Sequence, residues 1–432
     1  MSGHILSITA AQRLDSRGKP TVKVVLTTAK GTFTSLVPSG ASVGEYEAHE
    51  LRDGKKDQYG GNSVLAAIQN VEKVISPALI KEKFNVATDL AKIDEFMIRL
   101  DGTKNKTKLG ANAILAVSMA AARAGAAEKD VPLYEFLRQE ALATGPYVLP
   151  TPFFNVLNGG KHSGNTMAFQ EFMIAPVGAT SITHAVQIGS EVYQALKAII
   201  TQKFGSAAGG IGDEGGFAPP VSHPTEALDL LTLAVHNAGH DGKVKFAIDP
   251  ASSEFFTSDK YDLGFKTKER NFLSKQELQN LYLSLLKKYP IILLEDPFAE
   301  DDWEAWKSFK KVCPVELVGD DLLATNIERI NIAKDRDACT GLLLKINQIG
   351  SITESIAAAK KAFGYGWRVF VSHRSGETTD DFIADLTVGL STGHLKSGSP
   401  CRGERVAKYN RLMDIEDELA QTGKTFKYAG LP

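Results

Sequence analysis

Short apolar runs alternate with amphipathic helical patterns through the C-terminal two-thirds of the chain. The runs are KVKFAI (243–248), IILL (291–294), VELV (315–318), GLLL (341–344) and RVFV (368–371). Helical patterns between or after them cover 326–334, 351–363 and 379–390. Near-continuous apolar runs separated by helices are typical of parallel strands buried on both faces. We therefore predict an α/β fold with a (βα)8-type, TIM-like barrel, and keep a doubly wound open sheet as the alternative.

An ionisable side chain follows each of these runs. The set is Asp249, Glu295 with Asp296, Asp320 with Asp321, Lys345, His373 and, after the short run GHL, Lys396. The steps from 295 to 320, 345, 373 and 396 are 25, 25, 28 and 23 residues. One strand, one helix and two loops need about that length. Because barrel active sites lie at the C-terminal ends of the strands, we expect these side chains to meet in one pocket.

The chemistry of the set indicates a metal and a base. Carboxylates without His or Cys are hard oxygen ligands, so Asp249, Glu295 and Asp320 favour Mg²⁺ or Mn²⁺ over zinc. Lys345 would lie close to Lys396 and to the cation, so we expect its pKa to be lowered enough for a base. The cation would neutralise a substrate carboxylate, and the proton beside that carboxylate could then leave.

Two further segments offer an acid and an anion site. Glu214 lies in GDEGG (212–216), which on the motif alone could equally be a turn, and Glu171 follows Gln170. A close pair of carboxylates raises the pKa of one member, which could then carry a proton at pH 7. Arg374 and Ser375, in SHRSGET (372–378), offer a forked donor beside glycine amides, which suits a phosphate.

Two glycine motifs are decoys. GIGDEG (210–215) formally matches GxGxxG, but two acids stand where a pyrophosphate would approach, so we reject a dinucleotide site. GASVG (40–44) matches GxSxG without the strand, Asp and His of a hydrolase. We interpret it as a loop that closes over substrate. His162, in NGGKHSG (158–164), is expected at the pocket mouth.

The N-terminal part has a different texture. β-rich runs at 21–27 and 32–37 precede helical patterns at 63–74, 87–100 and 110–128, which predicts an α+β capping domain over 1–140 and a barrel domain over 141–432. The apolar stretch 109–127 is broken by polar residues, so we expect a buried helix and no membrane span, and no signal peptide is evident. A net charge of -2 argues against a nucleic-acid partner, and three scattered cysteines favour a reducing, cytoplasmic compartment.

With these motifs assembled, the chain resembles the enolase family (phosphopyruvate hydratase) from end to end. The matching segments are DSRG (15–18), SGAS (39–42), KLGANAILAVS (108–118), QEFMIAP (170–176), GDEGGFAP (212–219), ASSEFF (251–256), EDPFAEDDW (295–303), LLLKINQIGSITES (342–355) and SHRSGET. The resemblance implies Mg²⁺-dependent, reversible dehydration of 2-phosphoglycerate to phosphoenolpyruvate in glycolysis and gluconeogenesis. It implies Lys345 as the base and Glu214, supported by Glu171, as the acid.

The resemblance also implies ligand sets and a partner. Two Mg²⁺ ions are expected, one on Asp249, Glu295 and Asp320 and one with Ser42. The implied substrate-binding residues are His162, Glu171, Glu295, Asp320, His373, Arg374, Ser375 and Lys396. The implied partner is a second copy of the chain, in a homodimer.

The chain departs from the family pattern away from this site. Lys23 and Asp414 reverse the usual signs at two positions that family dimers often join, and Ala11 replaces a usual Arg. Val43 and Lys161 differ from the family in the loop segments around the pocket. Two alternatives remain at this point: a related lyase or epimerase acting on an acid sugar, and a binding or structural protein that keeps the fold.

Overall fold

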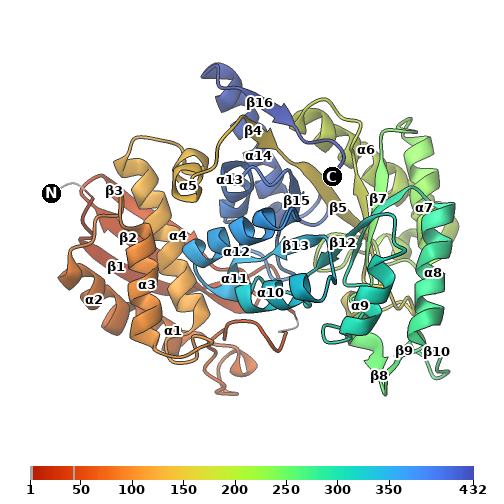
Figure 1. Ribbon diagram of the computed structural model, residues 1–432, viewed down its shortest axis with the longest axis horizontal. Coiled ribbons are helices and arrows are strands. Elements are labelled where there is room, and N and C mark those ends of the chain that lie inside the picture. Colours follow the sequence, from red (N-terminus) through yellow and green to blue (C-terminus); the bar gives the residue numbers. More distant parts are fainter. Residues whose placement is uncertain (1–2, 42–43) are drawn as a thin grey trace.

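The computed structural model describes residues 3–41 and 44–432 and has two unequal parts (Figure 1). The smaller part begins with an antiparallel sheet of β1 (Ser7–Leu14), β2 (Pro20–Thr28) and β3 (Gly31–Leu36). Its helices are α1 (Leu65–Asn70), α2 (Ser76–Glu82), α3 (Leu90–Asp101), α4 (Ala111–Glu128) and α5 (Leu133–Ala141), and a π-helical stretch (Val71–Ile75) joins the first two. Strands β2 and β3 confirm the runs predicted at 21–27 and 32–37, whereas β1 was not predicted.

Helix α4 is the apolar stretch predicted to be a buried helix, and it packs against β2 and β3. Fifteen of its residues are buried. In the part of the chain that the structure describes, no helix combines the length and the apolar character that crossing a bilayer requires.

The larger part is a closed eight-stranded barrel, which confirms the predicted architecture and excludes the open sheet. Around the barrel the strands are β11 (Ile291–Glu295), β12 (Glu316–Gly319), β13 (Gly341–Leu344), β14 (Arg368–Ser372), β15 (His394–Lys396), β5 (Thr151–Asn158), β6 (Glu171–Ala175) and β7 (Lys245–Asp249). The helices of this part are α6 (Ile182–Phe204), α7 (Pro224–Asn237), α8 (Lys275–Lys288), α9 (Trp303–Lys310), α10 (Ile327–Asp335), α11 (Ile346–Ile349), α12 (Ile352–Gly364), α13 (Phe382–Gly389) and α14 (Gly403–Gln421).

Short strands complete the chain outside the barrel. They are β4 (Tyr147–Leu149), β8 (Phe256–Thr257), β9 (Lys260–Asp262), β10 (Phe272–Leu273) and β16 (Phe426–Tyr428). Helices α10 and α12 match the predicted patterns, and each begins after a side chain that caps it, Asn326 and Ser351. The predicted boundary at residue 140 falls at the end of α5, and it stays a prediction.

Strand β6 is antiparallel to both of its neighbours, β5 and β7, whereas the sequence predicted parallel strands throughout. The reversal has a local cause, because only the loop 159–170 joins β5 to β6 and no helix returns the chain to the other end of the barrel. In the resulting register Glu171, the first residue of β6, pairs with Asn158 and with Asp249, the last residues of β5 and β7. The reversal therefore brings Glu171 to the edge at which the other strands end.

An apolar cluster fills the barrel. Its members are Phe153, Met173, Ala175, Ala247, Leu293, Val318, Leu343 and Phe370. Side chains alternate between the two faces of a strand, so the residue two positions beyond an interior residue also points inward. Asp249, Glu295 and Asp320 stand two positions beyond Ala247, Leu293 and Val318, and Lys345 stands two beyond Leu343. The polar set is thus the layer of barrel interior directly above the apolar cluster.

Helix contacts and one buried acid join the two parts. Helix α12 packs against α3 and α4, and the backbone N–H of Thr353 donates to Oδ2 of Asp94 in α3 at 2.9 Å. Burial raises the pKa of Asp94 to about 6, although the hydrogen bonds from Thr353 and Ser118 oppose the shift. The fold therefore favours the protonated carboxyl, and it loses that contribution as the pH rises through about 6.

We predict that Asp94→Asn stabilises the protein at pH 8 and changes little at pH 4. Raising the pKa of Asp94 from its ordinary value to about 6 corresponds to roughly 3 kcal/mol of stability by linkage. The gain should develop between pH 4 and pH 7, and thermal unfolding across that range would measure it. Asp89→Asn is the control, because hydrogen bonds from Lys92 and from the backbone of Asn85 lower the pKa of Asp89. That substitution should cost stability at pH 8, and gains of equal size at both pH values for Asp94→Asn would contradict the assignment.

Candidate active site

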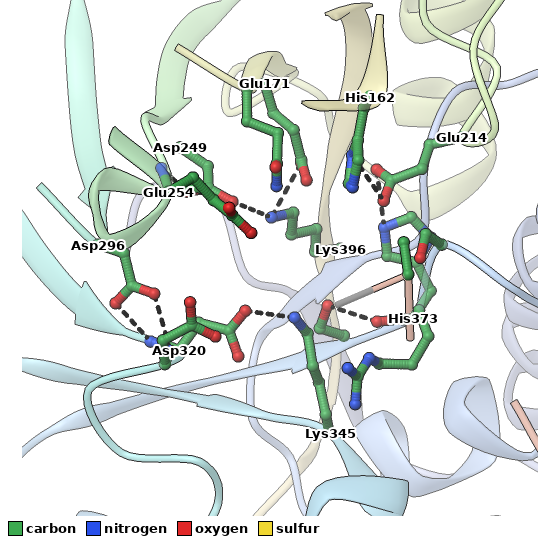
Figure 2. A pocket seen from close by; sticks show the side chains of 17 residues that line it. His162, Glu171, Glu214, Asp249, Glu254, Asp296, Asp320, Lys345, His373 and Lys396 are labelled. Carbon is green, nitrogen blue, oxygen red and sulfur yellow. Dashed lines mark hydrogen bonds and ion pairs between the residues drawn. The ribbon is translucent and has the colours of Figure 1, made fainter. Parts of the chain in front are cut away.

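Buried carboxylates gather around Lys396 at the carboxyl edge of the barrel (Figure 2). The Lys396 Nζ lies 2.9 Å from Glu171 Oε2, 3.3 Å from Asp249 Oδ2 and 2.8 Å from Glu295 Oε2. Burial opposes the ammonium form, but the charges of these acids outweigh burial, and the pKa of Lys396 is raised well above its ordinary value. Burial, with the nearby charge of Asp249, raises the pKa of Glu295 as well. The cluster thus holds more acid than its ammonium group can neutralise.

Lys345 pairs with Asp320 on the opposite side of the pocket. Burial alone would lower the pKa of this ammonium. The negative charges of Asp320 and Glu295 together outweigh burial, so the pKa of Lys345 is raised. The expectation of a lowered pKa is therefore wrong for the protein alone. It assumed a cation at Asp320, and such a charge would oppose this ion pair.

Asp296 is a site residue that the sequence argument mentioned but gave no role. Both of its carboxylate oxygens accept backbone N–H groups, from Asp320 at 2.9 Å and from Asp321 at 2.7 Å. Strand alternation would turn it away from Glu295, but its φ is 39°, in the left-handed region that non-glycine residues seldom adopt. The turned backbone lets two consecutive acids reach the same pocket.

Among the described residues, three groups of acids and histidines each have ligand atoms close enough to hold one ion, and two of these groups lie in this pocket; the third, Glu45, Glu300 and Asp301, is more exposed. The oxygens of Asp296, Asp320 and Asp321 lie within 4.8 Å of one another, as do atoms of His162, Glu171 and Glu214. The predicted set Asp249, Glu295 and Asp320 does not form such a group among the described residues, and it stays a prediction. The donor chemistry nevertheless fits a hard divalent cation, because buried carboxylates outnumber the lysines beside them.

Glu171 and Glu214 have opposite pKa shifts. Burial, with the charge of Glu214, raises the pKa of Glu171 to about 8. Burial also acts to raise the pKa of Glu214, but His373, His162 and Arg405 outweigh it and hold that pKa well below the usual value. The sequence predicted that one member of this pair would carry a proton and assigned the acid role to Glu214. The opposite pKa shifts favour the proton on Glu171 and the negative charge on Glu214.

Arg374 is buried and pairs with Glu47, a residue that the sequence argument missed. Its Nη1 lies 2.9 Å from Glu47 Oε2, and its Nη2 lies 3.1 Å from Oε1, which is a bidentate pair. Burial opposes the charge of Arg374, but the Glu47 carboxylate outweighs it and raises the pKa of Arg374. Glu47 lies three residues after the predicted loop 40–44. Its position next to that loop was the one feature of the sequence that could have indicated a place near the pocket. The predicted ligand Ser42, like Val43, lies outside the described residues.

The loop after β5 carries His162 to the rim of the same pocket. The His162 Nδ1 lies 3.8 Å from Glu214 Oε1, and the neighbouring Lys161 pairs with Glu254 on the loop after β7. The pocket is also lined by Ala41, Gln170, Ala251, Ser372, His373 and Ser375. All predicted site residues that the structure describes therefore meet at this one edge of the barrel.

Comparison with known proteins covers nearly the whole chain. Residues 5–137 match the family model described as the enolase N-terminal domain. Residues 146–431 match the one described as the enolase C-terminal TIM barrel domain.

We predict that Glu47→Gln lowers the free energy of unfolding by about 3 to 5 kcal/mol, because it takes the balancing charge from a buried guanidinium. Urea denaturation would measure the loss. The matched control is Glu50→Gln in the same segment. Glu50 pairs with Arg52, and their side chains are 17% and 19% exposed, so we expect a loss of about 1 kcal/mol or less. Equal losses in the two variants would show that the Glu47–Arg374 pair adds nothing of its own.

Proposed function

The chain belongs to the enolase family and is a lyase of the enolase type, and we propose that it converts 2-phosphoglycerate reversibly into phosphoenolpyruvate with Mg²⁺. The observation that carries this proposal is the buried layer of acids and lysines above the apolar cluster of the barrel. Such a layer offers a place for a cation, a base and an acid around one small anionic substrate. The reaction belongs to glycolysis and gluconeogenesis.

We propose that Asp249, Glu295 and Asp320 hold the first Mg²⁺ and that Ser42 contributes to a second. When bound, Mg²⁺ neutralises the substrate carboxylate and stabilises the negative charge that develops on it during proton removal. The abundance of buried carboxylates beside only two lysines supports a divalent cation at this position.

Lys345 is the proposed base. Its Nζ is held at Asp320, on the wall of the pocket across from Glu171 and Glu214 (Figure 2). In its neutral form it would take the proton from the carbon next to the substrate carboxylate. Lys396, which is paired with three acids, keeps its proton and supports the charge of the substrate anion.

Glu171 and Glu214 are the proposed source of the proton for the leaving hydroxide. With the pKa of Glu171 at about 8 and that of Glu214 lowered, the pair holds one proton near pH 7. Glu171, which carries this proton, would transfer it to Glu214, and Glu214 would pass it on to the departing hydroxyl group; the reverse reaction would return the proton to Glu171.

The proposed phosphate contacts are Arg374 and Ser375, with His162 at the rim of the pocket and His373 buried beside Glu214. A guanidinium presents a planar fork that matches phosphate oxygens, and it keeps its charge at every relevant pH. This feature favours 2-phosphoglycerate over the unphosphorylated acids that a related lyase or epimerase would take.

The free cysteines are consistent with a reducing, cytoplasmic compartment.

The activity prediction uses phosphoenolpyruvate formation, followed by absorbance, with and without Mg²⁺. Lys345→Ala should lower kcat by about 10²- to 10⁴-fold, the usual cost of losing a general base. Lys360→Ala, an exposed lysine on α12, is the control and should keep the wild-type rate. An unchanged rate in Lys345→Ala would overturn the assigned base, and turnover of unphosphorylated acids alone would overturn the proposed substrate.

We also propose that the chain forms a homodimer in which Lys23 of one protomer meets Asp414 of the other. Within the described residues neither side chain makes an ion pair, and Asp414 is exposed. Charge reversal by Lys23→Glu alone should weaken the dimer, and the double variant with Asp414→Lys should restore it. Analytical ultracentrifugation would measure both effects. Independent, additive effects of the two substitutions would contradict the pairing. Ala11 stands where the family usually has an Arg that can form a further contact between protomers. The same experiment should therefore also determine the dissociation constant of the wild-type dimer.

A further inference from the structure

Arg405 is a fully buried cation on α14 that lies beneath the proposed acid group. Its guanidinium donates to three backbone carbonyls: from Nη1 to Arg374 at 2.6 Å, and from Nη2 to Asp213 at 3.0 Å and Ser375 at 2.8 Å. It also meets the ring Nδ1 of His373. One side chain thus holds the loop that carries Glu214 and the loop that carries the proposed phosphate contacts.

The contact with His373 decides which ring nitrogen carries the proton. An arginine guanidinium only donates hydrogen bonds, so the Nδ1 that it meets must present its lone pair. The opposite nitrogen, Nε2, lies 3.4 Å from Glu214 Oε2, and an ionised carboxylate only accepts. A ring turned by half a rotation would place carbon atoms against both groups.

We propose that Arg405 is a positioning residue that fixes His373 as the neutral Nε2–H tautomer, so that the ring donates to Glu214 and keeps the negative charge there. The inference rests on the proposed function and deepens it, since it explains which member of the acid pair holds the proton. With Nδ1–H instead, two donors would face each other at Arg405. Two lone pairs would face each other at Glu214.

The charges around the ring agree with this arrangement. His373 is 2% exposed, and burial lowers its pKa to about 4, so the ring is neutral at pH 7. Arg405 and Lys396 oppose a charge on the ring, while Glu214 alone favours it. His162, on the loop after β5, and Asn155, within β5 itself, also face Glu214, and Asn155 Nδ2 donates to Glu214 Oε2 at 2.9 Å. A neutral donor toward Glu214 therefore leaves the single proton of the acid pair on Glu171.

Lys408 offers a matched control on the same helix. It lies one turn beyond Arg405, is equally buried, and donates to Glu377 Oε2 at 2.7 Å and to the Thr378 carbonyl at 2.6 Å. It therefore supports the same loop, 372–378, without touching His373. A purely structural role of Arg405 would make the two substitutions equivalent.

The experiment is nitrogen-15 NMR of histidine-labelled protein at pH 7 without substrate, with the His373 signals assigned by their loss in His373→Gln. The wild type should show a protonated Nε2 and an unprotonated Nδ1. Arg405→Met should move His373 toward the Nδ1–H form, Arg405→Lys should retain the wild-type form through its cationic donor, and Lys408→Met should leave the tautomer unchanged. Because the readout needs no turnover, it separates this inference from the proposed reaction.

Kinetics give the second readout. In 2-phosphoglycerate dehydration, Arg405→Met should lower kcat by about 10- to 100-fold, by analogy with the loss of a hydrogen-bond partner that orients a metal-bound histidine. A wild-type His373 protonated on Nδ1 would overturn the proposal, and this measurement needs no variant to fold. An unchanged tautomer in Arg405→Met would overturn it equally.

Discussion

The excess of buried carboxylates over buried ammonium groups is the constraint on which the site depends. Burying one uncompensated charge costs several kcal/mol, so every acid in this layer needs a partner or a proton. The structure uses each available means: lysine pairs for Asp249 and Asp320, backbone amides for Asp296, and a shared proton for Glu171 and Glu214. The charge that remains makes the pocket receptive to a divalent cation.

Backbone geometry decides which acids enter this layer. Simple alternation turns a residue at or just beyond the end of several parallel strands inward, and that supplies Asp249, Glu295, Asp320, Lys345 and Lys396. Two exceptions add to them. The antiparallel β6 contributes its first residue, Glu171, and the left-handed φ of Asp296 turns a residue that alternation would point outward.

The sequence predicted the barrel because its apolar runs and the ionisable residues after them recur at a spacing that fits one strand, one helix and two loops. It did not predict the direction of β6, because a short run of four buried apolar residues after Glu171 looks alike in parallel and antiparallel strands. It missed the role of Glu47, whose partner Arg374 is 327 residues away along the chain. Its expectation of a lowered pKa for Lys345 assumed a bound cation; in the protein alone burial lowers this pKa, but the charges of Asp320 and Glu295 together outweigh burial and raise it.

The pairing of Lys396 with three acids has a consequence for how the protein matures. In small zinc domains the cation is needed to neutralise its own ligands, so the chain stays unfolded until the metal arrives. Here the lysine is part of the chain and reaches the acids as soon as the barrel closes. Folding of the barrel would then not depend on the proposed metal, and an ion bound there could enter and leave a pocket that is already formed.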